Sequence, residues 1–297
     1  LKARAMPLEL PIQILRETTL RLDDLNSNPN VRSLTPMSDR AWNIGTALYY
    51  KAGGKPWRLA GARRGVCYVG LAFRLANPRD SRSTSAVCAA QMFLEDGDGI
   101  VFKGEYGPWY SERGENFHLS ESAAANLLDG VLQTYRSLGG PELSEIFLHS
   151  RSAFNDQEWR GYEEACPAGT KLTGVRVRPE RAGGLKLYRP GTRPVIRGTF
   201  WKLTERTGFL WGSGFIPELE QYPGHETPLP QRIDVLRGDA DLDTVASDIF
   251  GLTKLNYNAC KIGSSQPVTV GFSDAVGEIL VANPTASGVQ PQFRYYI

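Results

Sequence analysis

The pattern of apolar and polar positions along the chain is dominated by one apolar run in its first third. Residues 65–73 are small, β-branched or aromatic, and polar residues bound the run on both sides, with Arg63 and Arg64 before it and Asn77 after it. Such a run is apolar at successive positions, so both of its faces are expected to be buried. The pattern predicts a central strand over 66–73.

Further strands are predicted on both sides of this run. Residues 8–22 alternate apolar and polar positions, which predicts a strand that begins after Pro11. The segments 86–95 and 99–106 flank Asp-Gly-Asp-Gly, a typical hairpin signal, so an antiparallel pair is expected there. Later strands are predicted at 143–149, 172–178, 198–204, 208–212 and 231–237.

Helices are indicated by capping residues and by apolar faces. Thr35 is the expected N-cap of a helix over 36–51, with Pro36 at its first position and Gly53 after its end. Ser120 is the expected cap of a second helix, over 120–138, and a third covers 156–166. Two more are predicted at 241–252 and at 274–282, the last capped by Ser273. The order of elements predicts an α/β fold with a mixed sheet.

Composition and motifs argue against a metal-binding or disulfide-rich protein, a membrane protein and a nucleotide hydrolase. The formal net charge is only +2, from 34 basic and 32 acidic residues. The four cysteines show no metal-binding or disulfide spacing, and no apolar run approaches the 18 or so residues of a membrane span. No phosphate-binding glycine loop of the nucleotide hydrolases is present. A soluble cytoplasmic protein is expected.

Basic residues are nevertheless concentrated in two regions. The first cluster comprises Arg58, Arg63, Arg64, Arg74, Arg79 and Arg82, and the second comprises Arg176, Arg178, Arg181, Lys186, Arg189, Arg193 and Arg197. Any single arginine is better explained as part of a solvated, ion-paired surface. Two clusters in a nearly neutral chain favour a localised groove for a polyanion.

Several separated segments resemble Argonaute proteins, and they occur in the order of that family. They are Leu-Pro-Ile-Gln-Ile at 10–14, Leu-Tyr-Tyr-Lys-Ala-Gly-Gly-Lys-Pro-Trp at 48–57, Gly-Ser-Gly-Phe-Ile-Pro at 212–217, Asp-Ile-Phe-Gly-Leu-Thr-Lys-Leu-Asn-Tyr-Asn at 248–258, and 267–280 with the final Ile297. The resemblance is strongest to short prokaryotic Argonautes. It implies the C-terminal part of a MID-like domain at 1–60 and a PIWI domain with an RNase H-like mixed sheet, helices on both faces, at 61–297.

The resemblance assigns a pocket for the 5′ phosphate of a guide strand to Gln13, Lys51 and the carboxylate of Ile297. It also implies a structural Mg²⁺ between Gln13, Ile297 and the phosphate. A lysine offers a compact charge with three donors, which suits a phosphate. Lys51 could equally be a favourable cation at a helix C-terminus, and Ile297 could belong to a tail packed for stability. The tyrosine and second lysine of the family pocket have no identified counterparts.

The resemblance places the guide backbone beside a second segment, which contributes Lys254, Asn256, Asn258 and Lys261. Amides and ammonium groups bind phosphate oxygens without reading base sequence. As an alternative, these residues could simply form a polar helix end with asparagine caps.

The positions of the family's metal-binding acids are degenerate. They fall at Ala72, Arg151 and Asp274, and Glu105 only lies in the region of the family's mobile glutamate. A two-metal nuclease needs several converging carboxylates, so no cleavage is expected. Asp274 could equally be an acid that stabilises a helix start. His149 has no recognisable nucleophile or acid partner and is expected to be structural or to face nucleic acid.

The resemblance therefore implies a catalytically inactive protein that uses a guide, with RNA favoured, to recognise a complementary strand, with single-stranded DNA favoured. An associated effector with an APAZ region would act with it, as a heterodimer, in antiviral defence against invading DNA. One alternative is an RNase H-like nuclease whose acids lie elsewhere in the sequence. Another is a structural partner that no longer binds a guide. The sequence leaves the guide type, the preferred 5′ base and the effector open.

Overall fold

An eight-stranded mixed sheet forms the centre of the computed structural model, which describes residues 1–21, 35–61, 63–75, 85–93, 99–108, 118–180, 184–222, 224, 226–260, 263–282 and 290–297. The strand order is β3-β2-β1-β4-β5-β8-β7-β6. The strands are β1 (Val66–Leu75), β2 (Ser85–Phe93), β3 (Gly99–Pro108), β4 (Glu145–Ser150), β5 (Lys171–Pro179), β6 (Phe200–Lys202), β7 (Thr207–Leu210) and β8 (Gln231–Arg237). β4 runs parallel to β1 and β5, and the other neighbours are antiparallel.

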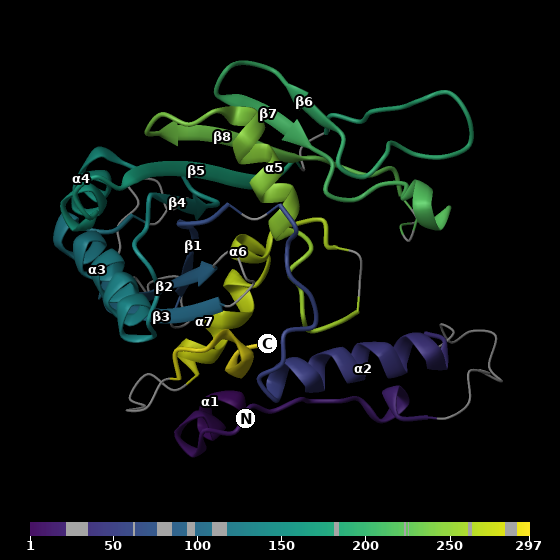
Figure 1. Cartoon of the computed structure of the whole chain (residues 1–297), viewed down its shortest axis with the longest axis horizontal. Helices are drawn as coiled ribbons and strands as arrows, with labels where there is room; N and C mark the ends of the chain where they lie inside the picture. The colour runs from purple at the N-terminus through teal and green to yellow at the C-terminus, as the bar shows by residue number, and fades with distance from the viewer. Residues whose placement is uncertain are drawn as a thin grey trace.

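Helices cover both faces of this sheet (Figure 1). They are α1 (Lys2–Ala5), α2 (Met37–Lys51), α3 (Glu121–Ser137), α4 (Asp156–Ala165), α5 (Leu242–Leu252), α6 (Val268–Gly271) and α7 (Ser273–Val281). α3 and α4 pack on one face, and α5, α6 and α7 pack on the other, which confirms the predicted fold class. Within the described residues, no helix has the length and apolar character needed to cross a membrane.

β1 is buried on both faces, as its apolar run predicts. Cys67, Val69 and Leu71 pack with α3 and α4, whereas Val66 and Tyr68 point into the core on the opposite side. Successive side chains of a strand alternate between the two faces of a sheet. A strand in this position therefore has to be apolar at every residue, and this is why its sequence predicts its place so well.

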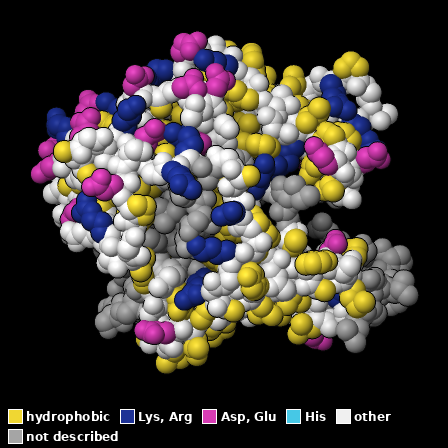
Figure 2. All heavy atoms as spheres, in the orientation of Figure 1, with side chains coloured by type: hydrophobic (Ala, Val, Ile, Leu, Met, Phe, Trp, Pro, Cys, Tyr) yellow, Lys and Arg dark blue, Asp and Glu magenta, His cyan; other side chains and the backbone are white. Residues whose placement is uncertain are grey.

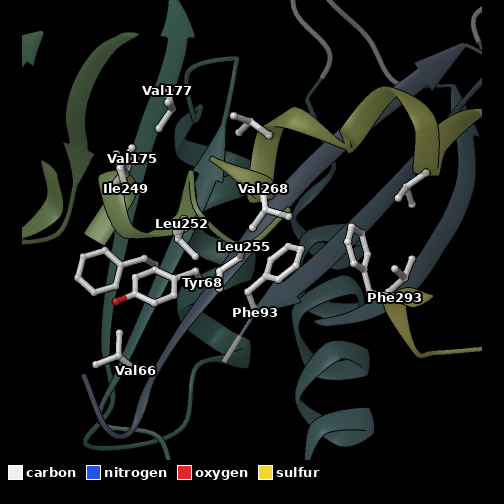
Figure 3. Close-up of a cluster of buried hydrophobic side chains, with 14 of the residues drawn as sticks. Val66, Tyr68, Phe93, Val175, Val177, Ile249, Leu252, Leu255, Val268 and Phe293 are labelled. Atoms are coloured by element: carbon white, nitrogen blue, oxygen red, sulfur yellow. The ribbon is translucent and has the colours of Figure 1, made fainter. Parts of the chain in front are cut away.

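The core on the opposite side joins the sheet to the last residues of the chain (Figure 3). Phe293 lies edge-on to Phe93 of β2, with 5.1 Å between ring centroids, and edge-on to Phe272, with 5.5 Å. Tyr296 and Ile297 are also buried. The aromatic end of the sequence is thus packed, as its composition predicts, and Figure 1 shows the two chain ends on the same side of the molecule.

α6 lies directly against β1 at Gly70. A Cβ atom at this position would lie only 1.9 Å from the backbone oxygen of Thr269. Thr269 also bonds to Nδ1 of buried His149 through its hydroxyl, at 3.0 Å. The glycine therefore lets α6 approach the sheet far more closely than a side chain would permit.

The predicted strand at 8–22 is wrong. Residues up to 21 form a 3₁₀ turn at Met6–Leu8, an extended segment and a second turn at Glu17–Thr19. A strand needs a ladder partner, and this segment has none among the described residues. Its alternating apolar positions are accordingly left open, with Leu10 61% and Ile14 57% exposed. The predicted domain boundary at residue 60 stays a prediction.

Two predicted caps are also wrong. The cap position of α2 is Pro36, without a side-chain bond, and the backbone oxygen of Thr35 accepts from Arg40 Nε at 2.8 Å instead. α7 is preceded by Phe272 rather than capped by Ser273, because it follows α6 after a single residue. By contrast, Ser120 caps α3 as predicted, with its hydroxyl accepting from the Ala123 N–H at 3.3 Å.

We expect Gly70→Ala to destabilise the protein. The added methyl group collides with backbone rather than with a flexible side chain, so the free energy of unfolding should fall by about 1–3 kcal/mol or more. Urea unfolding measures it. Gly45→Ala is the matched control, because nothing lies within 4 Å of a Cβ at this helical position, and there alanine should stabilise by about 0.5–1 kcal/mol. Equal effects of the two substitutions would contradict the close packing of α6.

Candidate nucleic-acid interface

The structure brings Lys51 and Ile297 together from opposite ends of the chain. Lys51 is the last residue of α2 and only 7% exposed. Its ammonium donates to the backbone oxygen of Ile297 and to that of Arg294, the latter at 3.3 Å. A buried ammonium needs such acceptors, since an unpaired buried charge is very costly. The end of α2 is thus fastened to the C-terminal segment.

A second lysine, which sequence reasoning missed, lies beside this contact. Lys2 Nζ donates to the backbone oxygen of Tyr296 at 3.2 Å. Burial, together with the nearby positive charge of Lys2, lowers the pKa of Lys51 to about 8. Burial also lowers the pKa of Lys2. No local motif marks Lys2 in the sequence, because its role depends on a residue 294 positions away.

No hydrogen bond joins Gln13 to Lys51 or Ile297 in the described part of the chain. Tyr295 donates its hydroxyl to the backbone oxygen of Glu9 at 3.2 Å, which lays the N-terminal segment along the C-terminal one. The side-chain oxygen of Gln13 is buried and lacks a partner among the described residues. The side-chain oxygen of Gln292 and Nε of Arg294 are also buried and lack a hydrogen-bond partner among the described residues. Orphaned polar atoms of this kind call for an explanation, and a missing ligand is one.

The segment after α5 is anchored to the end of α2. The indole N–H of Trp57 donates to the backbone oxygen of Lys254 at 2.7 Å, and the Tyr257 hydroxyl donates to the backbone oxygen of Trp57 at 2.7 Å. The rings of Tyr50 and Tyr257 are 4.8 Å apart. Two of the predicted sites, the pocket at Lys51 and the segment 254–258, are therefore held together by aromatic packing.

The predicted backbone-binding residues differ in their surroundings. Lys254 is half-buried, with Nζ 4.7 Å from the ring centroid of Phe250. The Asn256 side chain accepts from the backbone N–H of Asn258 at 3.0 Å in a turn beyond the end of α5, so it does not cap the helix, and Asn258 itself is exposed. Lys261 lies outside the described residues.

Arg197 adds a second cation beside Lys254. Its guanidinium lies 4.6 Å from the centroid of the same Phe250 ring and donates to the Thr253 hydroxyl at 2.6 Å. The ring therefore positions one ammonium and one guanidinium at the end of α5. Sequence reasoning placed Arg197 only within a basic cluster, because Phe250 and Thr253 are more than fifty residues away.

The two basic clusters are only partly available to a ligand. Arg63 forms ion pairs with Asp248 at 2.6 Å and Glu145 at 2.9 Å, and Arg176 pairs with Asp234 at 2.8 Å. Among the described residues, the exposed members are Arg58, Arg64, Arg178, Lys186, Arg189 and Arg193, whereas Arg79, Arg82, Arg181 and the side chain of Arg74 lie outside the described part. Figure 2 shows lysine and arginine side chains in a band down the middle of one face, from the sheet toward the chain ends.

Two of the three positions that the sequence resemblance assigns to metal-binding acids lie on, or directly after, adjacent strands. Ala72 belongs to β1, and Arg151 directly follows β4, whose register places Gly70 opposite His149. Arg151 donates to the backbone oxygen of Val270 at 2.9 Å and to the Gln266 side chain at 3.3 Å. It thus fastens α6 to the end of β4. Asp274 is the second residue of α7, and its side chain is outside the described part.

No cluster of three or more histidine, cysteine, aspartate or glutamate side chains suited to a metal occurs among the residues described. His149 is 1% exposed, and burial lowers its pKa to about 3. It is therefore a neutral core residue and does not face nucleic acid, which corrects the second of its two expected roles.

The mixed sheet with helices on both faces matches the RNase H-like, PIWI-like fold seen in solved structures of Argonaute proteins. Clostridium butyricum Argonaute, bound to a guide DNA with a 5′ deoxycytidine and a 19-mer target DNA, matches all of this chain at 17% identity and a TM-score of 0.73. Aa-Ago with externally bound siRNA also matches all of it, at 18% identity and 0.63. Aquifex aeolicus Argonaute matches 86% of it, at 19% identity and 0.58.

The chain spans only 34–38% of the length of these three proteins. No family model and no curated protein matches the sequence. At identities below one fifth, the likeness establishes the fold, and the function has to be argued from the residues themselves.

We expect His149 to make stability depend on pH. Its pKa in the folded protein, about 3, lies below its ordinary value of 6.5. Below pH 6.5 the unfolded chain therefore binds a proton that the folded chain does not, and stability falls as the pH decreases. At pH 5 the loss should be about 2 kcal/mol relative to pH 7. Urea unfolding of His149→Asn should show a shallower pH dependence than the unaltered protein, and identical slopes would contradict the assignment.

Proposed function

We propose that this chain binds the 5′-phosphorylated end of a short guide strand and thereby recognises complementary nucleic acid. The observation that carries the proposal is the convergence of Lys2 and Lys51 on the backbone oxygens of Tyr296 and Ile297. Two ammonium groups in one partly buried place repel each other, and a phosphate that carries close to two negative charges would relieve this repulsion.

The neighbouring groups suit such a ligand. Gln13 would contribute an amide, and Arg294 would contribute a guanidinium whose Nε lacks a partner among the described residues. Lys254 and Arg197, held on the ring of Phe250, would take the next phosphates along the strand. These contacts address phosphate groups, so base pairing with the guide would supply the sequence specificity.

The proposal includes a structural Mg²⁺ at the guide end. The buried side-chain oxygen of Gln13, which accepts no hydrogen bond among the described residues, and the backbone oxygen of Ile297 are hard oxygen ligands of the type that Mg²⁺ takes. When bound, the ion would neutralise part of the phosphate charge. Lys2 and Lys51 would hold the remaining phosphate oxygens.

We further propose that the chain does not cleave the target. Ala72 supplies no carboxylate, and the Arg151 guanidinium lies at the strand end where a divalent ion would need acids. The rival, an RNase H-like nuclease with acids elsewhere, would need a carboxylate cluster outside the described residues. An effector with an APAZ region, in a heterodimer that acts against invading DNA, completes the proposal and rests on the sequence resemblance alone.

Loss of the lysine contacts should weaken phosphorylated guides selectively. Lys51→Ala removes a charge-assisted hydrogen bond, so we expect the affinity for a 5′-phosphorylated oligonucleotide to fall roughly 10- to 150-fold, with a similar direction for Lys2→Ala. The affinity for the 5′-hydroxyl form should hardly change. Fluorescence anisotropy at fixed salt measures both. Lys171→Ala, at the exposed start of β5, is the matched control and should affect neither. Equal losses for the two oligonucleotides would reduce Lys51 to a helix-end cation.

A cleavage assay tests the inactive site. With a guide, a labelled complementary strand and either Mg²⁺ or Mn²⁺, the protein should leave the target intact. Only one of the three assigned positions, Asp274, is an acid, and one acid cannot hold two metal ions. Guide-dependent cutting at a single position, abolished by Asp274→Ala, would show that the acids lie where the sequence resemblance does not place them.

Purification from the native cells tests the partner. We expect a stoichiometric complex with a protein that carries the effector activity. A chain that elutes alone, with no companion and no fused effector domain, would contradict the heterodimer.

A further inference from the structure

A pocket separate from the lysine site lies beyond the end of β5. Its volume is about 500 Å³, and the residues at issue are Pro179, Ser213, Pro228, Gln231, Ser265 and Gln266. Gln231 is the first residue of β8, paired with Pro179 of β5 and Leu210 of β7. The pocket thus opens beside the strand ends, next to the segment that leads into α6.

Gln231 is the unusual residue of this pocket. It is only 4% exposed, and its side-chain oxygen has no hydrogen-bond partner in the described part of the chain. It shares a face of β8 with Ile233 and Val235, which are fully packed in the core. An apolar residue would serve this position better in a purely structural role, because a buried side-chain oxygen without a hydrogen-bond partner is costly. The amide turns readily about its last side-chain bond, which brings its oxygen or its N–H₂ group toward the pocket.

The walls of the pocket are held in place from outside. The indole N–H of buried Trp211 donates to the backbone oxygen of Pro228 at 3.2 Å. The chain at Gly212 passes so close to Ser265 that a Cβ atom would lie 2.4 Å from the Ser265 backbone oxygen. The side-chain oxygen of Gln266 is fixed by Arg151 at 3.3 Å. A fixed pocket loses little freedom when a ligand enters, so it favours binding.

The charges select the kind of ligand. Glu180 and Glu226 also line the pocket, and their carboxylates would repel a phosphate there. Exposed Arg189 and Arg193 lie 5.4 and 5.2 Å from the ring centroid of Phe215, which follows the pocket residue Ser213 by two positions. A ligand with a neutral, planar, hydrogen-bonding part and an attached phosphate fits this division of charge.

We propose that this pocket takes one unpaired base of a nucleic-acid strand, with Gln231 bonding to the edge of the base and the outer arginines holding its phosphates. The proposal rests on the proposed function, since it needs a strand bound nearby. The proline rings of Pro179 and Pro228 offer apolar surfaces to the faces of the base. The base has to be unpaired, because pairing occupies the hydrogen-bonding edge that Gln231 would contact.

The test uses two 5′-phosphorylated single-stranded oligonucleotide series that differ at one position at a time. Oligonucleotides of the first series keep every base, and those of the second lack the base at one position but have the same number of phosphates. For one position, loss of the base should weaken binding to the unaltered protein. Gln231→Leu, which keeps the size of the side chain, should remove about 2- to 13-fold of that base-dependent difference, the share of one hydrogen bond. It should leave thermal stability unchanged or raised, because the orphaned oxygen disappears.

Gln133→Leu, on the exposed surface of α3, is the matched control and should leave the base dependence intact. A 4-thiouracil base at the sensitive position should crosslink within residues 222–231. Strong binding without base dependence, or a crosslink elsewhere, overturns the base pocket and leaves the lysine site standing. Loss of stability in Gln231→Leu with unchanged base dependence makes Gln231 structural and overturns it as well. Absence of binding by any of these oligonucleotides overturns both proposals.

Discussion

The contact between the Lys51 ammonium and the backbone oxygens of the C-terminal segment is the constraint on which the candidate site depends. A buried ammonium that loses its acceptors is costly by several kcal/mol, so the end of α2 and residues 294–297 have to stay together. The same segment inserts Phe293 between Phe93 and Phe272. The site formed by Lys2 and Lys51 is thereby fixed to the central sheet. The contact between Trp57 and Tyr257 also fixes it to the segment after α5.

The other end of the functional surface is shaped by α6. Gly70 admits the backbone of this short helix, His149 bonds to its Thr269, and Arg151 bonds to its Val270. Gly70 in the middle of β1, His149 near the end of β4 and Arg151 just after it therefore all serve the packing of α6. This arrangement is the basis of our proposal that the chain holds strands without cutting them. It also carries Gln266 toward the pocket that contains Gln231.

The sequence predicts the strands well and the long-range electrostatics poorly, for physical reasons. β1 was predictable because burial on both faces demands an apolar residue at every position. The segment 8–22 was mispredicted because alternation alone does not show whether a partner strand exists. Arg63 and Arg176 belonged to basic clusters, yet their acids, Asp248 and Asp234, lie far away in sequence.

The candidate site shows the same division. The Argonaute-like segments indicated Lys51 and Ile297, whose contact the structure shows, because each segment carries its own pattern. The sequence does not predict Lys2, and it predicts Arg197 only as a member of a basic cluster, since their contacts with Tyr296 and Phe250 form only in three dimensions. The sequence does not predict a role for Gln231 for a similar reason. A glutamine at the start of a strand is unremarkable until its neighbours show that it is buried.

The pH dependence of phosphate-specific binding tests the central claim most directly. Burial lowers the pKa of Lys51 to about 8, and a bound phosphate would favour its charged form and raise that pKa. The ratio of affinities for 5′-phosphorylated and 5′-hydroxyl oligonucleotides should therefore fall above pH 8, by up to about tenfold per unit for one proton taken up. Lys51→Arg, which stays charged, should flatten this decline. A ratio that does not change between pH 7.5 and pH 9.5, or a decline unaltered in Lys51→Arg, would contradict the account.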